Sequence, residues 1–384
     1  GGMVVGPEVP IRATRWGGTG VKSAVRTHLD YFPYVGEVGT ANTVGVAGLK
    51  RGGLDHADLW RITMHEQTSR RNSEQEIEIA MQALNGLPIP KRMRWGDSDA
   101  EFVRPVHWLL FLHGSDIVDC SLLDTAAGRL THGHRFHAPG AIAINHPSDY
   151  ESALRYEGKV IAGFEARREA IREQVDVTAT SLKGHVDIDE ELLDEVTALV
   201  EWPVPVAGSF EEKYLEVPHE ALILTMKKNQ KYFHLLDSSG RLLPYFITIS
   251  NIESSNPLVI RDGNERVIRP RLADAMFFWQ QDGRKTLEAR IESLKSVVFQ
   301  NRLGTLHDKS ERVAALALAI AGQIGGDGEL AHRAGMLSRC DLMTEMVYEF
   351  PDMQGIMGRY QARRDGEPAE LAEAMEEFYL PRFS

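Results

Sequence analysis

The sequence has few cysteines, no long hydrophobic run and no excess of positive charge. Its 384 residues include only two cysteines, Cys120 and Cys340, which lie far apart in the chain. Two distant thiols without an export signal argue against a disulfide framework and are typical of the reducing cytoplasm. No stretch approaches the ~18 to 20 apolar residues of a membrane-spanning helix, and residues 1–10 lack the order of a secretory signal. We therefore expect a cytoplasmic protein with no membrane role.

The net charge of −12 argues against a protein that coats nucleic acid without specificity. Binding to phosphate is carried by clustered lysines and arginines, and here the acidic residues are in excess. Positive charge is still concentrated locally, at residues 91–94, at residues 227–231, and at Arg261, Arg266, Arg269 and Arg271. The chain can thus be acidic overall and basic on one face.

Hydrophobic periodicity divides the chain into three regions, at a length that allows two or three domains with cores of their own. Residues 1–72 hold neither a helical nor a strand period for long, so we expect a poorly defined lead-in. Residues 73–262 mix helix and strand patterns, which predicts an α+β domain. Residues 263–384 show mainly the helical period, which predicts an all-helical domain, and the lack of a closing helix suggests that this domain is incomplete.

Several elements can be placed within these regions. Ser73 and Glu76 are spaced as a capping box, which predicts a helix that ends before Gly86. A strand over 104–113, a turn at 114–116 and a strand over 117–123 predict a hairpin. The other expected elements are helices over 148–157, 164–183 and 190–200, strands over 232–236 and 243–250, and helices over 272–281, 287–299, 309–323, 330–350 and 370–379.

A glycine-rich stretch near the start resembles a phosphate-binding loop. Residues 17–23 read Gly-Gly-Thr-Gly-Val-Lys-Ser. That motif needs glycine directly before the lysine, and Val21 stands there instead. No clear strand precedes the stretch and no clear helix follows it, so a flexible glycine turn is the favoured interpretation.

The densest histidine cluster is residues 131–137, Thr-His-Gly-His-Arg-Phe-His. In an extended segment His132 and His134 would share one face, a spacing that can hold a metal ion. No carboxylate or thiol with a familiar zinc spacing lies beside them, so a polar strand end or an RNA-facing surface is favoured. Gly133, between the two imidazoles, suits a close backbone approach or a positive φ.

The pair His307-Asp308 suggests a metal-dependent phosphohydrolase of the HD type. His332 and Asp341 offer further ligands, but no second His-Asp pair follows them. A helix start explains the pair more simply, because an aspartate is favoured near the positive end of the helix dipole. A metal site requires all of its ligands, so the sequence predicts no metal site.

Residues 227–233, Lys-Lys-Asn-Gln-Lys-Tyr-Phe, interleave positive charge with aromatic rings. This combination contacts phosphates and stacks on unpaired bases in RNA-binding proteins. A solvated helix end followed by core aromatics explains the same pattern equally well, because Lys and Arg are common on any surface.

From Leu87 to the end, short motifs follow one another in a fixed order. They are residues 90–96 (PKRMRWG), 102–108 (FVRPVHW), 131–136 (THGHRF), 192–196 (LLDEV), 200–204 (VEWPV), 230–233 (QKYF), 263–267 (GNERV), 271–275 (RLADA), 277–278 (FF), 303–306 (LGTL), 340–347 (CDLMTEMV), 350–351 (FP), 354–355 (QG) and 357–358 (MG). This ordered series resembles the beta subunit of bacterial two-subunit glycyl-tRNA synthetase over nearly 300 residues, and residues 1–72 match it weakly.

The resemblance implies an architecture and a division of labour. It implies an α+β module similar to the B3/B4 region of another synthetase, followed by a helical domain similar to HD folds that lacks the metal ligands. It also implies that the family continues past Ser384 into the rest of the helical domain and an anticodon-binding domain. The class II active site, with ATP and Mg²⁺, is expected on the alpha subunit of a tetramer of two alpha and two beta subunits. The beta subunit is expected to bind and position tRNA(Gly), with no cofactor and no catalytic residue on this chain.

Charge and aromatic pattern then select the residues that we expect to contact RNA. They are Arg94, His132, His134, Arg135, Lys227, Lys231, Tyr232, Arg269 and Arg271. Two other functions stay open: a stand-alone HD-type metal-dependent phosphohydrolase, and an RNA-binding module without a synthetase partner.

Overall fold

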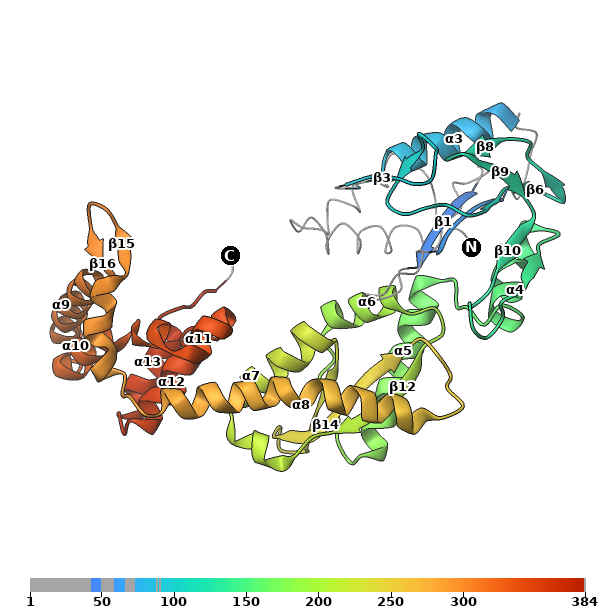
Figure 1. Ribbon diagram of the computed structural model, residues 1–384. Helices are drawn as coiled ribbons and strands as arrows, with labels where there is room; N and C mark the ends of the chain where they lie inside the picture. Colours follow the sequence, from blue (N-terminus) through green and yellow to red (C-terminus); the bar gives the residue numbers. More distant parts are fainter. Residues whose placement is uncertain (1–42, 50–58, 66–72, 88, 90, 383–384) are drawn as a thin grey trace. The chain divides into compact units, whose positions relative to one another are not determined.

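The computed structural model describes residues 43–49, 59–65, 73–87, 89 and 91–382 (Figure 1). The chain forms two compact units, and each is described by itself. The first unit comprises Gly1–Ala207, Lys231–Ser239 and Ile247–Arg261, and the second comprises Gly208–Gln230, Gly240–Phe246 and Asp262–Ser384. Helices and small sheets occur together, so the expected mixed α and β composition is confirmed. The expected domain limits at residues 72 and 262 stay a prediction.

The first unit contains a strand pair that the sequence analysis missed. β1 (Thr43–Leu49) pairs with β2 (Leu59–His65) in an antiparallel register that sets Thr43 opposite His65. Gly45 and Gly48 interrupt the apolar pattern of β1, and glycine weakens the strand signal because it has no side chain to pack. A period of two is therefore not visible there.

Helix α3 (Ser73–Asn85) covers the first core cluster, with the bounds that the sequence predicts. Ala80 and Leu84 of this helix pack with buried residues of the following strands, among them Phe102 and Phe111. The strands are β3 (Met93–Arg94), β4 (Glu101–Phe102), β5 (Leu109–Leu110), β6 (Leu112–His113), β7 (Asp116–Ile117), β8 (Ser121–Leu122) and β9 (Thr125–Gly128).

The predicted hairpin is present only around its turn. β6 and β7 pair with His113 opposite Asp116, as the turn signal indicates. The long strand expected over residues 104–113 is wrong, because β5 pairs with β9 in parallel and belongs to a different sheet from β6. Leu109, Leu110, Phe111 and Leu112 are all buried, so the apolar residues do not mark one face.

The remaining helices of the first unit agree with the sequence. β10 (Leu130–His132) pairs with β11 (Ala141–Ala143), and a 3₁₀ turn, η1 (Pro147–Asp149), leads into α4 (Tyr150–Tyr156). α5 (Phe164–Ser181) and α6 (Glu190–Leu199) follow. Buried Arg167 of α5 contacts α6, because its Nε donates a hydrogen bond to Thr197 O at 3.0 Å. The three expected helices are thus confirmed.

Three later strands form one sheet in the order β12–β14–β13. They are β12 (Val204–Ser209), β13 (Phe233–Leu236) and β14 (Leu242–Ser250), and the last two match the predicted strands. Between β12 and β13 lie η2 (Glu212–Glu216), α7 (His219–Leu224) and the π-helix η3 (Thr225–Gln230).

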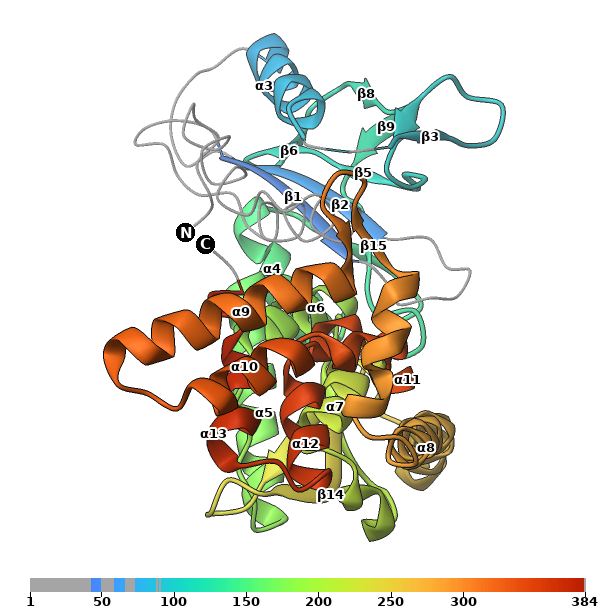
Figure 2. The same cartoon turned by 90° about the vertical axis from the view of Figure 1, so that its left-hand side faces the viewer.

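The helices that follow are more interrupted than the sequence predicts (Figure 2). α8 (Pro257–Asp282) is longer than the expected 272–281 and contains Pro270. The expected helix over 330–350 is broken into α10 (Gly328–Leu337), η5 (Cys340–Met343) and α11 (Glu345–Glu349). The other elements are η4 (Glu288–Ser296), α9 (Leu306–Ile324), η6 (Pro351–Met353), α12 (Ile356–Arg364) and α13 (Ala369–Glu377).

The expectation of an all-helical domain over residues 263–384 is wrong at one place. β15 (Val298–Gln300) pairs antiparallel with β16 (Gly304–Thr305), and Gly304 turns the chain at φ +83°. That left-handed value favours glycine, because a Cβ would be strained there. The helix predicted over 287–299 therefore ends before β15, and α9 begins directly after β16.

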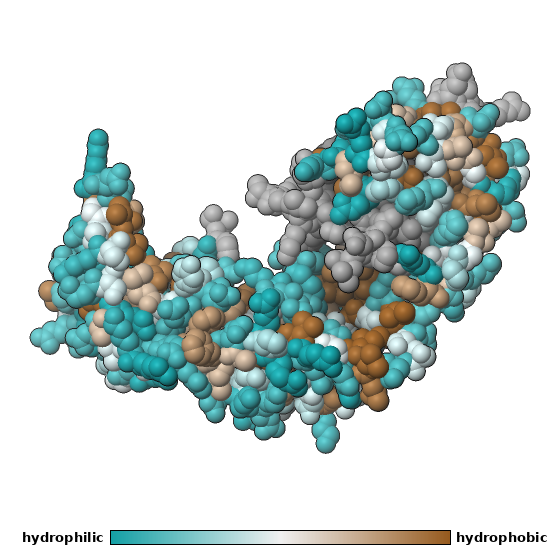
Figure 3. Space-filling view, in the orientation of Figure 1, coloured by the Kyte–Doolittle hydropathy of each residue, from teal (hydrophilic) through white to brown (hydrophobic). Residues whose placement is uncertain are grey.

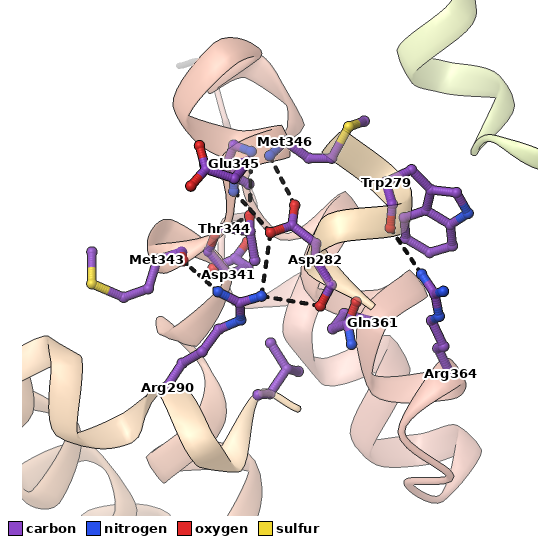
Figure 4. Close-up of polar contacts among 12 residues, drawn as sticks. Trp279, Asp282, Arg290, Asp341, Met343, Thr344, Glu345, Met346, Gln361 and Arg364 are labelled. Carbon is purple, nitrogen blue, oxygen red and sulfur yellow. Dashed lines mark hydrogen bonds and ion pairs between the residues drawn. The ribbon is translucent and has the colours of Figure 1, made fainter. Parts of the chain in front are cut away.

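A buried carboxylate joins the broken helices of the second unit (Figure 4). Asp282, at the end of α8, accepts hydrogen bonds from the backbone N–H groups of Glu345 and Met346, both at 2.9 Å. Its Oδ1 also pairs with Arg290 at 3.2 Å, and Arg290 donates to Met343 O at 2.7 Å. Asp282 therefore caps the first turn of α11 and neutralises a buried arginine at the same time.

Candidate nucleic-acid interface

The turn at residues 131–137 is built around His134. This side chain is 1% exposed, and its Nε2 lies 2.6 Å from Asn251 O. Its Nδ1 accepts the backbone N–H groups of Phe136 at 3.2 Å and His137 at 3.3 Å. The Nε2 nitrogen must therefore carry the proton, and both ring nitrogens are engaged within the first unit. His134 shapes the turn.

A close backbone contact holds the same turn from the other side. His134 N donates to Gly158 O at 2.6 Å. A Cβ on Gly133 would lie 2.5 Å from both the Cα and the O of Gly158, a distance that two backbones cannot accommodate. This is the close approach that the sequence predicts for Gly133.

The anchored turn presents a cation and an aromatic ring outward. Arg135 is exposed, and the Phe136 side chain is 64% exposed. The turn is held at its far end by His137, whose Nε2 accepts Glu253 N at 3.0 Å. An exposed guanidinium beside an exposed ring on a fixed backbone can contact a phosphate and stack on an unpaired base. We name Arg135 and Phe136 the presented pair.

His132 lies beside this turn but does not share its role. Its ring packs against Trp108, with the ring centroids 4.7 Å apart, and it is half-buried. Because the His134 nitrogens are committed to Asn251 and to the turn, the two imidazoles do not form a metal pair. The metal interpretation of this cluster was already the weaker one, and this geometry gives it no support.

The segment around Lys227 is divided by the fold. Lys227 belongs to the second unit, whereas Lys231 and Tyr232 belong to the first. Lys231 has a φ of +62° and pairs with Glu195 at 2.9 Å. Tyr232 is 3% exposed, and burial raises the pKa of its hydroxyl to about 12. The expectation that Tyr232 stacks on RNA is corrected here, because a buried ring offers no free face.

The other arginine candidates are exposed, and two of them have acidic partners. Arg94, on β3, pairs with Asp99 at 3.4 Å and approaches Glu101 at 4.0 Å. On α8, Arg269 pairs with Glu211 at 2.8 Å, and Arg271 is exposed. Exposed pairs of this kind exchange readily, since they contribute only ~0 to 1 kcal/mol. The predicted residues thus form separate groups in the two units, with Lys227, Arg269 and Arg271 in the second and the others in the first.

The His307-Asp308 pair is a helix start, as the sequence analysis favoured. Thr305 accepts Asp308 N at 3.3 Å, and Asp308 Oδ2 accepts Thr305 N at 2.7 Å, which completes a capping box. The Thr305 N–H is the first cause of the lowered pKa of Asp308. Among the described residues, one group of three or more His, Cys, Asp or Glu residues has its ligand atoms within 4.8 Å of one another, and it consists of His307, Asp308 and Glu311. The proposed further ligands, His332 and Asp341, are outside that group.

Asp341 is instead a buried structural acid. It is 1% exposed, its Oδ2 accepts Gly355 N at 2.6 Å, and burial raises its pKa to about 6. The neighbouring Cys340 is fully buried in the second unit's core, as expected for a small apolar residue. Both therefore act in packing.

Two further expectations concern the rest of the chain. The glycine-rich stretch at residues 17–23 lies outside the described residues. Within the described part of the chain, no helix has both the length and the apolar character needed to cross a membrane.

Phe136 is an exposed residue that the sequence-based selection of candidate RNA contacts did not include. It stands beside Arg135 in the segment for which the sequence favoured a polar strand end or an RNA-facing surface, and an aromatic residue next to a cation there was the available signal. Asn251 was missed too, because nothing in the local sequence shows that its carbonyl anchors a histidine 117 residues away.

Comparison with known proteins gives a consistent result. Residues 41–384 match the family described as "Glycyl-tRNA synthetase beta subunit". Proteins named "Glycine--tRNA ligase beta subunit" from Hahella chejuensis, Chromohalobacter salexigens and Pseudomonas putida are 53%, 56% and 56% identical over 326, 306 and 304 residues. These alignments cover 85%, 80% and 79% of this chain but only 47%, 44% and 44% of the relatives. The chain therefore spans less than half the length of these curated relatives.

Proposed function

Because this chain belongs to the glycyl-tRNA synthetase beta subunit family, we propose that it works as part of the beta subunit of a bacterial two-subunit glycine–tRNA ligase. Its role is to bind tRNA(Gly) and hold it in register while glycine is attached. The observation that carries this proposal is the match over residues 41–384, which includes the presented pair. Positioning of a reactant removes much of the entropy cost of a bimolecular step.

The chemistry of the reaction is assigned to the partner. The family is that of an aminoacyl-tRNA synthetase subunit, and the relatives carry the name of a beta subunit. We place ATP, Mg²⁺ and glycine on the alpha subunit of a cytoplasmic tetramer of two alpha and two beta subunits. The B3/B4-like character of the first part and the HD-like character of the helical part belong to the same proposal.

The structure narrows the residues that we propose for RNA contact. The presented pair, Arg135 and Phe136, combines a phosphate ligand with a stacking surface on one rigid turn. Lys227, Arg269 and Arg271 of the second unit and Arg94 of the first are proposed as phosphate contacts. We assign His134 to shaping the turn and Tyr232 to the core. That His132 and Lys231 contact RNA stays a prediction.

The first experiment is glycine charging of tRNA(Gly) by purified alpha subunit, with and without this 384-residue chain. RNA binding by the chain alone is followed in parallel by fluorescence anisotropy. Charging that depends on the chain supports the proposal. RNA binding without any effect on charging would favour a stand-alone RNA-binding module. A divalent ion retained in stoichiometric amount after purification, together with phosphate-ester hydrolysis, would favour the HD-type phosphohydrolase.

Single substitutions test the presented pair. We expect Phe136→Ala to weaken tRNA binding by about 1 to 3 kcal/mol with an unchanged salt slope, because base stacking carries no charge. The plot of log K against log salt has a negative slope, and Arg135→Ala should make it shallower by ~0.7 to 0.9, since one phosphate contact is lost.

The matched control is Arg155→Ala, which removes an exposed cation of α4 in the same unit. It should leave both affinity and salt slope unchanged. Equal effects of Arg135→Ala and Arg155→Ala would show that only overall charge matters and would remove the presented pair from the interface. The double variant Lys227→Ala/Lys231→Ala should also make the salt dependence of binding shallower than in the parent chain. An unchanged salt dependence would show that these two lysines do not contact phosphates.

A further inference from the structure

Two aromatic rings of the first unit are largely exposed. The Tyr156 side chain, at the end of α4, is 74% exposed, and the Phe136 side chain is 64% exposed. The other aromatic side chains whose burial is described in this unit are buried or half-buried. A single exposed apolar residue is common on any surface, so the argument depends on whether the two rings belong together.

The segments that carry the two rings are joined by a backbone contact. Phe136 follows His134 by two residues, and Tyr156 precedes Gly158 by two residues. The His134 N–H donates to Gly158 O at 2.6 Å. Two residues of extended chain span about 7 Å, so the Cα atoms of Phe136 and Tyr156 are at most roughly 20 Å apart. The two rings therefore belong to one small region of the first unit.

This region is built on tightly packed backbone. A Cβ on Gly158 would lie 2.7 Å from Leu154 O and 3.2 Å from Ile142 Cδ1. Leu154 of α4 and Ile142 of β11 belong to one buried cluster. Figure 1 shows α4 next to β10, the partner of β11, and Figure 3 shows hydrophobic side chains among hydrophilic ones on the surface of this part of the chain. Both rings thus stand on segments whose positions are fixed by packing.

Each ring has an exposed cation close to it in the chain. Arg135 directly precedes Phe136, and Lys159 directly follows Gly158. The Lys159 Nζ lies 5.3 Å from the centroid of the Trp202 ring, and a cation is attracted to the face of an aromatic ring. The ammonium group is therefore held in place although its side chain is exposed. We call the two cations and the two exposed rings the two-ring surface, which consists of Arg135, Phe136, Tyr156 and Lys159.

We propose that the two-ring surface is one binding site for an unpaired segment of RNA, in which Phe136 and Tyr156 stack on bases and the two cations contact phosphates. Bases inside a duplex are stacked on each other, whereas unpaired bases can stack on aromatic side chains. Such stacking tolerates any sequence, because every base has a π face. The inference rests on the proposed RNA binding of this chain, and it adds the class of RNA structure that is bound, a single strand in place of a stem.

The composition of the two-ring surface favours RNA over a protein partner. Aromatic residues and arginine are enriched in protein interfaces, but lysine is depleted there. Lysine and arginine beside exposed rings complement a strand that carries one phosphate for each base. The position of Lys159 over Trp202 supplies this charge next to Tyr156.

Fluorescence anisotropy with two probes tests the site on the intact 384-residue chain. The probes are an unstructured RNA oligonucleotide and the same strand annealed to its complement. We expect the parent chain to bind the single strand more tightly than the duplex. Tyr156→Ala should weaken binding of the single strand by roughly fivefold or more, the effect of losing one stacked base, and should not change binding of the duplex. Tyr156→Phe keeps the ring and should bind both probes like the parent.

The matched control is Tyr348→Ala, which removes an 83% exposed tyrosine from α11 in the second unit. It should leave the affinities for both probes unchanged. Arg155, the neighbour of Tyr156 on α4, points about 100° away around the helix, so Arg155→Ala stays a control for charge alone. All of these variants should keep the melting temperature of the parent, because the side chains are exposed.

The outcomes separate this inference from the proposed function. Equal binding of the two probes by the parent, or parent-like binding of the single strand by Tyr156→Ala, would overturn the two-ring surface and leave tRNA binding by other residues in place. A Tyr156→Ala variant that binds RNA like the parent but lowers glycine charging by the alpha subunit would show a protein contact, which also overturns the inference. No RNA binding by the parent would refute the RNA-binding role itself, and the inference with it.

Discussion

Replacing Asp282 with alanine should be among the most damaging changes in the second unit. The side chain is 2% exposed, accepts two backbone N–H groups of α11 and pairs with Arg290, whose side chain is 9% exposed. Breaking a buried ion pair from one side costs about 3 to 5 kcal/mol, because the other charge stays buried. Arg290 keeps its bonds to Met343 O and to the backbone O of residue 282. We therefore expect a loss at the lower end, about 3 kcal/mol.

Urea unfolding measures this loss. With a denaturant slope of ~1 to 3 kcal/mol per M, the midpoint should fall by about 1 M or more at unchanged slope. Trp279 is the one tryptophan after residue 202, so its signal in ¹⁹F NMR of 5-fluorotryptophan-labelled protein reports on the second unit. It lies three residues before Asp282 on α8.

A double-mutant cycle separates the ion pair from the cap. Arg290→Met removes the buried charge, so Asp282→Ala should cost at least ~1.5 kcal/mol less in that background than in the parent. The remaining cost, ~1 kcal/mol, is the lost cap of α11. A destabilisation below ~1 kcal/mol for Asp282→Ala, or equal costs in the two backgrounds, would refute the reasoning.

Three other predictions concern stability. The pKa of Asp341 is raised to about 6 from an ordinary 3.8, so between these pH values the folded state holds a proton that the unfolded state releases. The free energy of unfolding should therefore fall by up to ~3 kcal/mol as the pH rises from about 4 to 6. The urea midpoint of Asp341→Asn should not show this pH dependence. Gly133→Ala should destabilise the first unit by more than ~2 kcal/mol because its Cβ meets Gly158 backbone, whereas Gly140→Ala, with open space, should be neutral by thermal melting. Thr305→Ala should cost about 1 kcal/mol, the value of a lost helix cap, in the same assay; no change would mean that the cap is replaced by water.

Local signals predicted the helices well where one face is apolar and the ends are capped. α6 shows both, since Asp189 accepts Leu192 N at 2.8 Å and Leu192 and Val196 are buried. α12 was missed because its buried face contains Gly358 and Gln361, which carry no apolar period. Sequence patterns report side-chain hydrophobicity, and a helix packed through small or polar residues leaves little of that signal.

The sequence identified the residue types of the candidate interface but not which of their side chains are exposed. The cluster at residues 131–137 was found from its residue types, and Arg135 proved to be exposed. His134 was expected to contact RNA, because the charge and aromatic pattern of this cluster selected it. Its Nε2 bonds to the carbonyl of Asn251, the residue directly after β14, and a contact over such a sequence distance leaves no local trace.

The dependence of the His134 turn on Asn251 also has a consequence for the order of folding. Contacts between residues far apart in sequence form late, because a long loop must close first. The Asn251 side chain additionally accepts the N–H groups of Glu201 and Trp202, at 2.6 and 3.0 Å. During synthesis, the presented pair can adopt its final geometry only after residue 251 has left the ribosome. The residues of α5 and α6 therefore emerge before the contact that completes the turn can form.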